Sequence, residues 1–147
     1  MINEIPIFDG HNDTLLRLHL ADPPNSQSFF VNSGQGHLDL PRAKEGNLGG
    51  GFFALFVPSP KMELSRYPGA SDDSSDGSYE LPLPPLLELP YAQQYILAMA
   101  ARMFRVEAES QGQVKIVRTV AEMRDCLQQG VFAMIFHIEG AGAIDTD

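Results

Sequence analysis

Four residues whose side chains bind metals or transfer protons follow two apolar segments of this chain. His11 and Asp13 come just after the apolar run 5–8, and His137 and Glu139 close the apolar run 131–139. Residues two apart in an extended segment leave the backbone on the same side, so each pair should present its imidazole and carboxylate together. These groups suit a divalent cation such as zinc. A His-x-Asp pair also occurs in ordinary loops, so the pattern alone leaves both interpretations open.

The composition predicts an acidic, soluble α/β protein. The 147 residues include 10 Lys and Arg and 19 Asp and Glu, which gives a formal net charge of −9. We expect no nucleic acid partner, because phosphates are bound by clusters of Lys and Arg. The chain shows no basic amphipathic segment, no signal-type start and no apolar run that could cross a bilayer, so we expect no membrane partner and a cytoplasmic location. The single cysteine, Cys126, excludes an intrachain disulfide and falls in a helical pattern, where it should be a small buried residue.

Apolar strands and helical patterns alternate along the chain. The strand candidates are the runs 5–8, 52–57, 114–117 and 131–139. The helix candidates, marked by apolar periodicity and capping residues, are 14–20, 39–46, 88–110 and 119–129. Asp39 is a candidate N-cap of the second, and Thr119 with Glu122 has the pattern of a capping box at the start of the last. Unbroken apolar strands need cover on both faces, which favours a parallel sheet with right-handed crossovers.

Gly49, Gly50 and Gly51 form a glycine run directly before the strand candidate 52–57. A phosphate-binding loop would follow a strand and end in Lys-Ser or Lys-Thr, and this run does neither. We therefore predict that these glycines allow close backbone packing at the strand's entrance.

The stretch 60–87 predicts a flexible insertion loop. Its run 71–78 is acidic and rich in Ser, and several prolines follow. Asp72, Asp73 and Asp76 lack the spacing and the closing Glu of a calcium loop, so a solvated loop is expected. A long excursion after a strand's carboxyl end is also where a lid over a site would lie.

His11, Asp13 and Glu139 are expected to approach one another in space. Ligands bind at the carboxyl ends of strands in both α/β barrels and open sheets, and these residues follow two such ends. A buried, unpaired carboxylate is costly, so Glu139 needs a partner if it points inward; otherwise it is only a polar strand end. His19 lies within the helix candidate 14–20 and is expected to be an exposed or packed helical residue.

Four segments occur in an order that resembles a known family. They are Phe8-Asp9-Gly10-His11-Asn12-Asp13, His37-Leu38-Asp39-Leu40-Pro41-Arg42, Gly49-Gly50-Gly51-Phe52-Phe53-Ala54 and Ile138-Glu139-Gly140. Together they resemble the renal (membrane) dipeptidase family of zinc metallopeptidases, within the amidohydrolase-type barrels. The resemblance is weakest over 60–87. It implies a (β/α)8 TIM-type barrel with two Zn2+ ions that hydrolyses dipeptides, including those with a C-terminal D-residue.

The resemblance also implies roles for three residues. Carried over by position, His11 and Asp13 would bind the first zinc, and Glu139 would be the catalytic carboxylate that bridges both metals. His137 is unusual beside Glu139; we expect it to support the site from behind the ligands, while a direct metal or substrate contact stays open.

Several parts of the family pattern have no counterpart in this chain. The further histidine ligands of the second zinc and the later substrate-binding residues are missing, and a barrel needs about 250 residues. The chain matches about three β/α units, so we expect residues 1–147 to be the N-terminal part of one barrel domain, as a natural fragment, a truncated reading frame or an engineered piece. By itself it should be inactive and self-associating. The alternatives are a related metal-dependent amide or lactone hydrolase and a non-catalytic fragment.

Overall fold

The computed structural model describes residues 5–21, 27–60, 86–145 and 147, and these residues form a parallel α/β structure. In chain order the elements are β1 (Ile7–Asn12), α1 (Thr14–His19), α2 (Leu40–Glu45), β2 (Leu48–Phe56), α3 (Leu89–Glu109), β3 (Val114–Ile116), α4 (Val120–Gln129) and β4 (Phe132–Glu139). The insertion loop expected over 60–87 lies almost wholly outside the described residues, and so does the acidic run 71–78. None of the helices described has the length and apolar character needed to span a bilayer.

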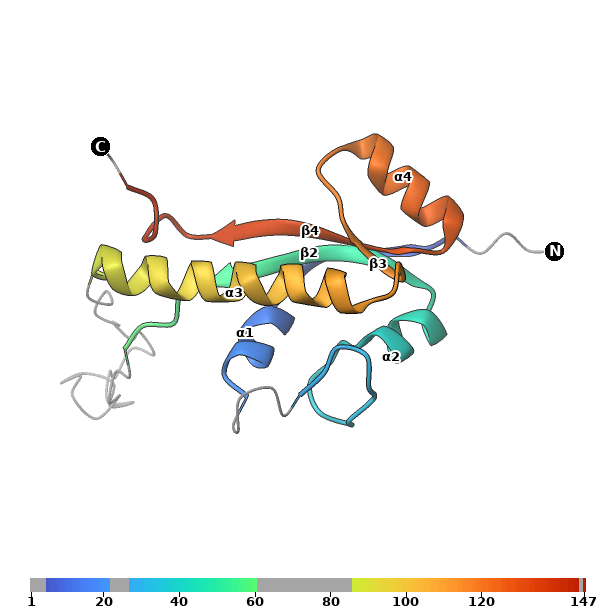
Figure 1. Cartoon of the computed structure of the whole chain (residues 1–147), viewed down its shortest axis with the longest axis horizontal. Coiled ribbons are helices and arrows are strands. Elements are labelled where there is room, and N and C mark those ends of the chain that lie inside the picture. Colours follow the sequence, from blue (N-terminus) through green and yellow to red (C-terminus); the bar gives the residue numbers. More distant parts are fainter. Residues whose placement is uncertain (1–4, 22–26, 61–85, 146) are drawn as a thin grey trace, which may run out of the picture.

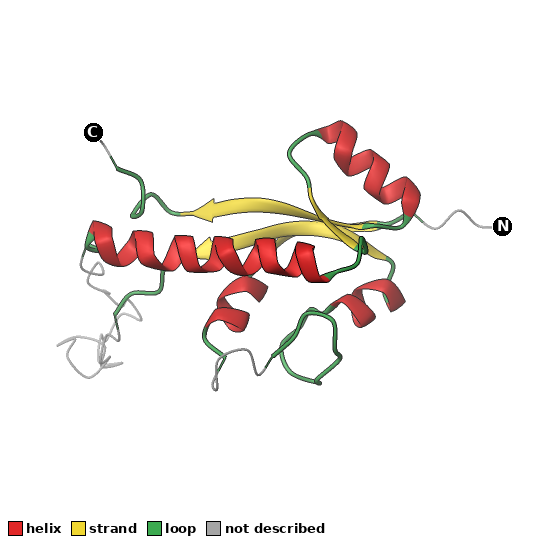
Figure 2. Ribbon diagram, in the orientation of Figure 1, coloured by secondary structure: helices red, strands yellow, loops and turns green. Residues whose placement is uncertain are grey.

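The four strands form one parallel sheet in the order β1-β2-β4-β3, which confirms the parallel pairing expected from the apolar runs. Residues 50–56 of β2 pair with residues 133–139 of β4, whereas β3 pairs only with residues 132–134. The carboxyl ends of β2 and β4 therefore point to the same end of the molecule (Figure 2). On the side of β3, residues 135–139 of β4 have no strand partner within the described part of the chain.

Helices cover the two faces of the sheet unequally. α1, α2 and α3 lie on one side and α4 lies on the other (Figure 1). The larger core lies under α1, α2 and α3, where Phe53 and Leu55 are fully buried together with Met99 and Met103 of α3. The apolar residues that recur every three or four positions in α3 thus face the sheet, as the periodicity of this helix predicts.

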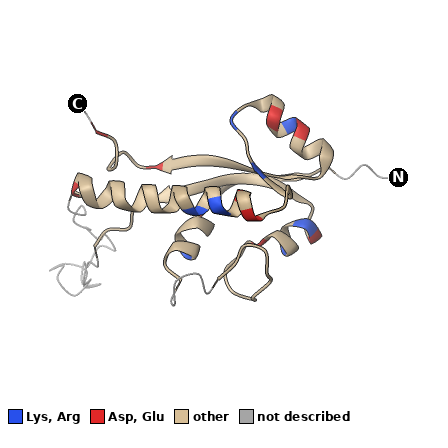
Figure 3. Cartoon of the chain, in the orientation of Figure 1, with Lys and Arg blue, Asp and Glu red and all other residues tan. Residues whose placement is uncertain are grey.

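The opposite side of the sheet, which we call the α4 face, carries a smaller cluster. Ala133 of β4 packs there with Cys126 of α4, and Phe8 and Ile135 lie against them. Cys126 is buried, as expected, and burial raises the pKa of its thiol. Charged residues gather on the helices and connecting loops and leave the central strands nearly free of charge (Figure 3).

The strands begin and end at different residues from those the apolar pattern predicts. β1 was expected over 5–8 but runs from Ile7 through the polar cluster to Asn12, and β2 already begins at Leu48 instead of Phe52. The cause is pairing: backbone hydrogen bonds between β1 and β2 place polar and glycine residues in extended structure. The apolar pattern of the side chains does not show where such backbone pairing begins and ends.

The glycines at the start of β2 allow its neighbours to approach closely. A Cβ added at Gly50 would clash with the carbonyl oxygen of Ala133 and lie 2.7 Å from Cε2 of Phe8. A Cβ added at Gly51 would lie 2.8 Å from the Cβ of Asp9. These distances confirm the prediction of close backbone packing.

We therefore expect Gly50→Ala to lower the free energy of unfolding by about 2–3 kcal/mol, because the clashing carbonyl belongs to the central strand pair and cannot rotate away. The matched control is Gly10→Ala, since nothing lies within 4 Å of a Cβ built there. That change should stay within about 0.5 kcal/mol. Urea unfolding followed by circular dichroism measures both, and equal losses would contradict the role given to Gly50.

A buried carboxylate fixes the start of α2. Asp39 is 2% exposed, and its Oδ1 accepts a hydrogen bond from the backbone N–H of Arg42 at 2.9 Å. Its Oδ2 accepts a second one from Nε of Arg42 at 2.7 Å. Asp39 is thus the N-cap that the sequence predicts, and the capping box of Thr119 and Glu122 at α4 is also confirmed.

Candidate metal centre

A bulge shapes the carboxyl end of β1. Asp9 pairs with Gly51 and Asn12 pairs with Phe53, so three steps along β1 match two steps along β2. The additional residue falls at Gly10 or His11, and such an insertion bends a strand and re-aims its side chains. The side chain of Asp9 stabilises the bend: Oδ1 accepts from the backbone N–H of His11 at 3.2 Å, and Oδ2 accepts from Nδ2 of Asn12 at 2.9 Å.

The structure brings His11, Asp13 and Glu139 together. Nε2 of His11 lies 3.6 Å from Oδ1 of Asp13 and 3.7 Å from Oε2 of Glu139. One ligand atom from each residue lies within 4.8 Å of the others. Asp13 is the N-cap residue of α1, with φ −97° and ψ 26°, so it lies beyond the strand. The bulge and the turn into α1, rather than strict strand alternation, therefore make the two residues of the His-x-Asp pair converge.

The spacing and chemistry of this group fit a small divalent cation. Separations of 3.6 and 3.7 Å are too long for hydrogen bonds. Zinc binds imidazole nitrogen and carboxylate oxygen at about 2.0–2.2 Å, which places neighbouring tetrahedral ligands about 3.3–3.6 Å apart. Two carboxylates of like charge also meet here, and no hydrogen bond from the described residues reaches either of them. A cation would relieve their repulsion.

The group is open to solvent on one side. The side chains of His11, Asp13 and Glu139 are 45%, 59% and 40% exposed. Catalytic zinc sites have three protein ligands and keep a further position for water or substrate, whereas structural sites are closed by four. The exposure therefore matches a reactive site better than a structural one.

The other three histidines lie outside this group. His19 lies in α1 and packs edge-on against the ring of Tyr95, with ring centroids 5.3 Å apart. This agrees with its expected role as a packed helical residue. His37 lies in the loop 36–38, which lines an open groove along β1. His137 lies on the same face of β4 as Glu139 but contributes no atom to the three-residue donor group.

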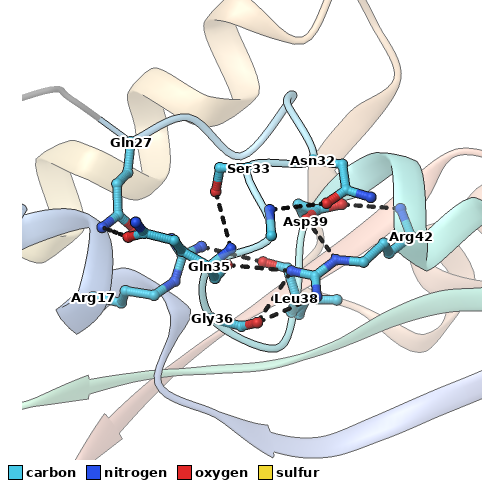
Figure 4. A network of polar contacts seen from close by, with 10 residues as sticks. Arg17, Gln27, Asn32, Ser33, Gln35, Gly36, Leu38, Asp39 and Arg42 are labelled. Atoms are coloured by element: carbon cyan, nitrogen blue, oxygen red, sulfur yellow. Dashed lines mark hydrogen bonds and ion pairs between the residues drawn. The ribbon is translucent and has the colours of Figure 1, made fainter.

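An open groove of about 800 Å³ follows β1 and reaches the donor group. Its outer wall is formed by residues 36–38, which a polar network holds in place (Figure 4). Arg17 donates to the carbonyl of Leu38 and to the side chain of Gln27, and burial lowers the pKa of its guanidinium. Arg42 donates to the carbonyl of Gly36. Two guanidinium groups thus fix the loop that faces the candidate site.

No role was predicted for Asp9 or Asn12, although both belong to the same polar cluster as His11. Asn12 donates from Nδ2 to the carbonyl of Phe52 at 3.1 Å, and its Oδ1 accepts from the backbone N–H of Thr14 at 3.3 Å. These two side chains connect the bulge to β2 and to the start of α1. The cluster of short polar residues after the apolar run 5–8 is visible in the sequence. The hydrogen-bond partners of these residues could not be predicted from it, because they depend on the register between β1 and β2.

Two solved structures resemble the chain closely. Dipeptidase AC, a metallopeptidase of family M19, is 46% identical, with 95% of this chain covered and a TM-score of 0.78. A metallopeptidase from Rhodobacter sphaeroides, liganded with a phosphinate mimic of the dipeptide L-Ala-D-Ala, is 45% identical over 97% of this chain, with a TM-score of 0.79. The probable dipeptidase PvdM from Pseudomonas aeruginosa is 18% identical with a TM-score of 0.70, which shows a shared fold alone.

The chain spans less than half the length of each of these relatives. It covers 38% and 40% of the first two structures, and 43% of a curated Acinetobacter calcoaceticus protein, described as an uncharacterized protein in the PQQ-III 3' region, to which it is 31% identical. Its parallel sheet matches part of the TIM-type barrel of the M19 structures, as the sequence predicts. The sequence profile of membrane dipeptidases matches residues 1–147 in full. The chain therefore belongs to the membrane dipeptidase family, peptidase family M19.

Proposed function

We propose that this chain carries the first part of the binuclear metal site of a zinc-dependent dipeptidase. The observation that carries the proposal is the meeting of His11, Asp13 and Glu139 at the carboxyl edge of a parallel sheet, with their ligand atoms within 4.8 Å of one another. Membership of the family supports dipeptides as the substrate class. The Rhodobacter sphaeroides structure, which contains a dipeptide mimic, supports the same class.

The three side chains have distinct roles in this proposal. His11 presents Nε2 as a neutral donor, while Asp13 and Glu139 bring negative charge that offsets a dication. Glu139 faces His11 with Oε2, so its second oxygen can bind a second cation and make this residue the bridging, catalytic carboxylate. Bound zinc would supply a water of near-neutral pKa and polarise the peptide carbonyl.

The domain organisation is part of the same proposal. Residues 1–147 form the N-terminal part of one metallo-dipeptidase barrel domain, and 60–87 is an insertion loop in its sequence. The described residues are compatible with this arrangement, because β2 ends at Phe56, shortly before position 60 in sequence. The cytoplasmic location expected from composition stays a prediction.

A zinc titration of the 147-residue chain tests the proposal. We expect one zinc ion per chain at pH 7, bound weakly enough for a chelator to remove it, because three residues supply ligands at one position. Equilibrium dialysis followed by elemental analysis measures the stoichiometry. A chain that stays folded and binds no stoichiometric zinc would contradict the proposal and favour a non-catalytic fragment.

A further inference from the structure

Four aromatic rings form a continuous row that ends at the candidate metal ligand His11. The row runs from Phe8 through Phe52 and His137 to His11, and we call it the ring row. Successive ring centroids are 6.1, 6.2 and 6.1 Å apart, with interplanar angles of 86°, 90° and 83°. All three contacts are edge-to-face, the geometry that the quadrupole of aromatic rings favours.

The inner rings of this row lie on the two inner strands of the sheet, whereas His11 lies on an edge strand. His137 lies on β4 opposite Ala54 of β2, and this small side chain leaves space for the imidazole on the α4 face. Phe52 lies on the central strand β2. His11, by contrast, lies at the bulge of the edge strand β1, and its side chain is 45% exposed.

The ring of His11 is supported by contact with a neighbouring ring. A metal-binding histidine nearly always donates its second ring N–H to a carboxylate, a carbonyl or water, which fixes the ring's orientation. In the described part of the chain, no side-chain hydrogen bond reaches either ring nitrogen of His11, and the bond to Asp9 comes from the backbone N–H of His11. The edge-to-face contact with His137 packs directly against this ring and so favours one orientation of it.

We propose that His137 is a positioning residue that acts through its ring. Backed by Phe52, it holds the imidazole of His11 so that Nε2 points to Asp13 and Glu139. The role requires a flat ring and does not require a nitrogen, because His137 contributes no atom to the donor group. This inference rests on the proposed metal function and assigns a specific task to a residue outside the ligand set.

Cobalt titration of the 147-residue chain, followed by visible absorption, tests this role. We expect His137→Ala to weaken Co2+ binding about 10-fold or more, which is the range for residues that orient a ligand. His137→Phe keeps the ring and should stay within about threefold of the wild type. An equal loss in both variants would show that a nitrogen of His137 is needed, and unchanged binding in His137→Ala would show that the ring is dispensable. Either result overturns the proposal.

Two further measurements keep the test independent of folding and of the metal. His137→Leu fills most of the volume without a ring, so it should weaken binding as His137→Ala does even if the alanine variant folds poorly. In metal-free chain, the ring protons of His11 should be shifted by the neighbouring rings in wild type and His137→Phe. They should move toward unstructured-peptide positions in His137→Leu. Unchanged His11 signals would overturn the positioning role, whereas wild-type chain that binds no Co2+ would overturn the proposed function alone.

Discussion

Replacing His11 or Asp13 by alanine should weaken zinc binding by more than about 100-fold, since residues that only orient a ligand already contribute 10–100-fold. Each substitution leaves two of the three donor residues at the position where the ligand atoms meet. Glu139→Gln should have a similar effect, because it keeps the side chain's size and removes a negative charge from a group that offsets a dication. Calorimetric titration of zinc into each purified variant measures the loss.

The matched control for this series is His19→Ala. His19 is also a half-buried histidine near β1 in sequence, but it lies in α1 against Tyr95 and takes no part in the donor group. Its replacement should leave zinc affinity within about twofold of the wild type, since it changes neither the charge nor the number of ligands. Comparable losses from all of these variants would mean that general unfolding, or another histidine, explains zinc binding. Unfolding midpoints measured on the same samples separate the two.

The secondary structure of this chain could be predicted largely from local chemistry. Asp39 marks the start of α2 because its carboxylate caps the free N–H groups, and Thr119 with Glu122 marks the start of α4 in the same way. The apolar spacing in α3 places Met99 and Met103 against the sheet. These signals depend on neighbours in sequence, so one chain is enough to see them.

The geometry of the candidate site could be predicted only in part. That His11, Asp13 and Glu139 would meet follows from polar residues after two parallel strands. The way in which they meet does not, because the bulge at Gly10 and His11 depends on how β1 pairs with a glycine-rich β2. A bulge is a property of the pair of strands, and a two-residue alternation rule applied to β1 alone cannot include it.

The contacts within the ring row could be predicted even less well from the sequence. Phe8, Phe52 and His137 are separated by more than 40 residues from one another in sequence, and the two phenylalanines look like ordinary strand residues. Their contacts require the strand order β1-β2-β4 and the register that places His137 opposite Ala54. The sequence could suggest that His137 supports the site from behind the ligands. It could not say through which atoms, because the answer lies in the packing of rings across three strands.

The 147-residue chain should not hydrolyse dipeptides by itself. In the described residues one donor group is found, so Glu139 alone is available to a second cation, too few ligands for a stable second site. A two-metal site stabilises the transition state by several kcal/mol, so its loss should reduce the rate at least about 1000-fold relative to a complete relative. Release of free amino acid from L-Ala-D-Ala and L-Ala-L-Ala measures turnover, and His11→Ala prepared in parallel reports contaminating hydrolases.

The open edges of the sheet predict that the isolated chain associates with itself. β1 has one strand neighbour and residues 135–139 of β4 have none on their outer side within the described structure, so unpaired backbone groups face solvent at both edges. Exposed apolar side chains lie beside them, with Phe136 and Ile138 at 37% and 42%. A barrel removes such edges by closing, and we expect the isolated chain to pair them with the edges of another copy. Sedimentation velocity should therefore show association that increases with concentration. A monomer with two bound zinc ions and rapid turnover would show that three β/α units already suffice for catalysis.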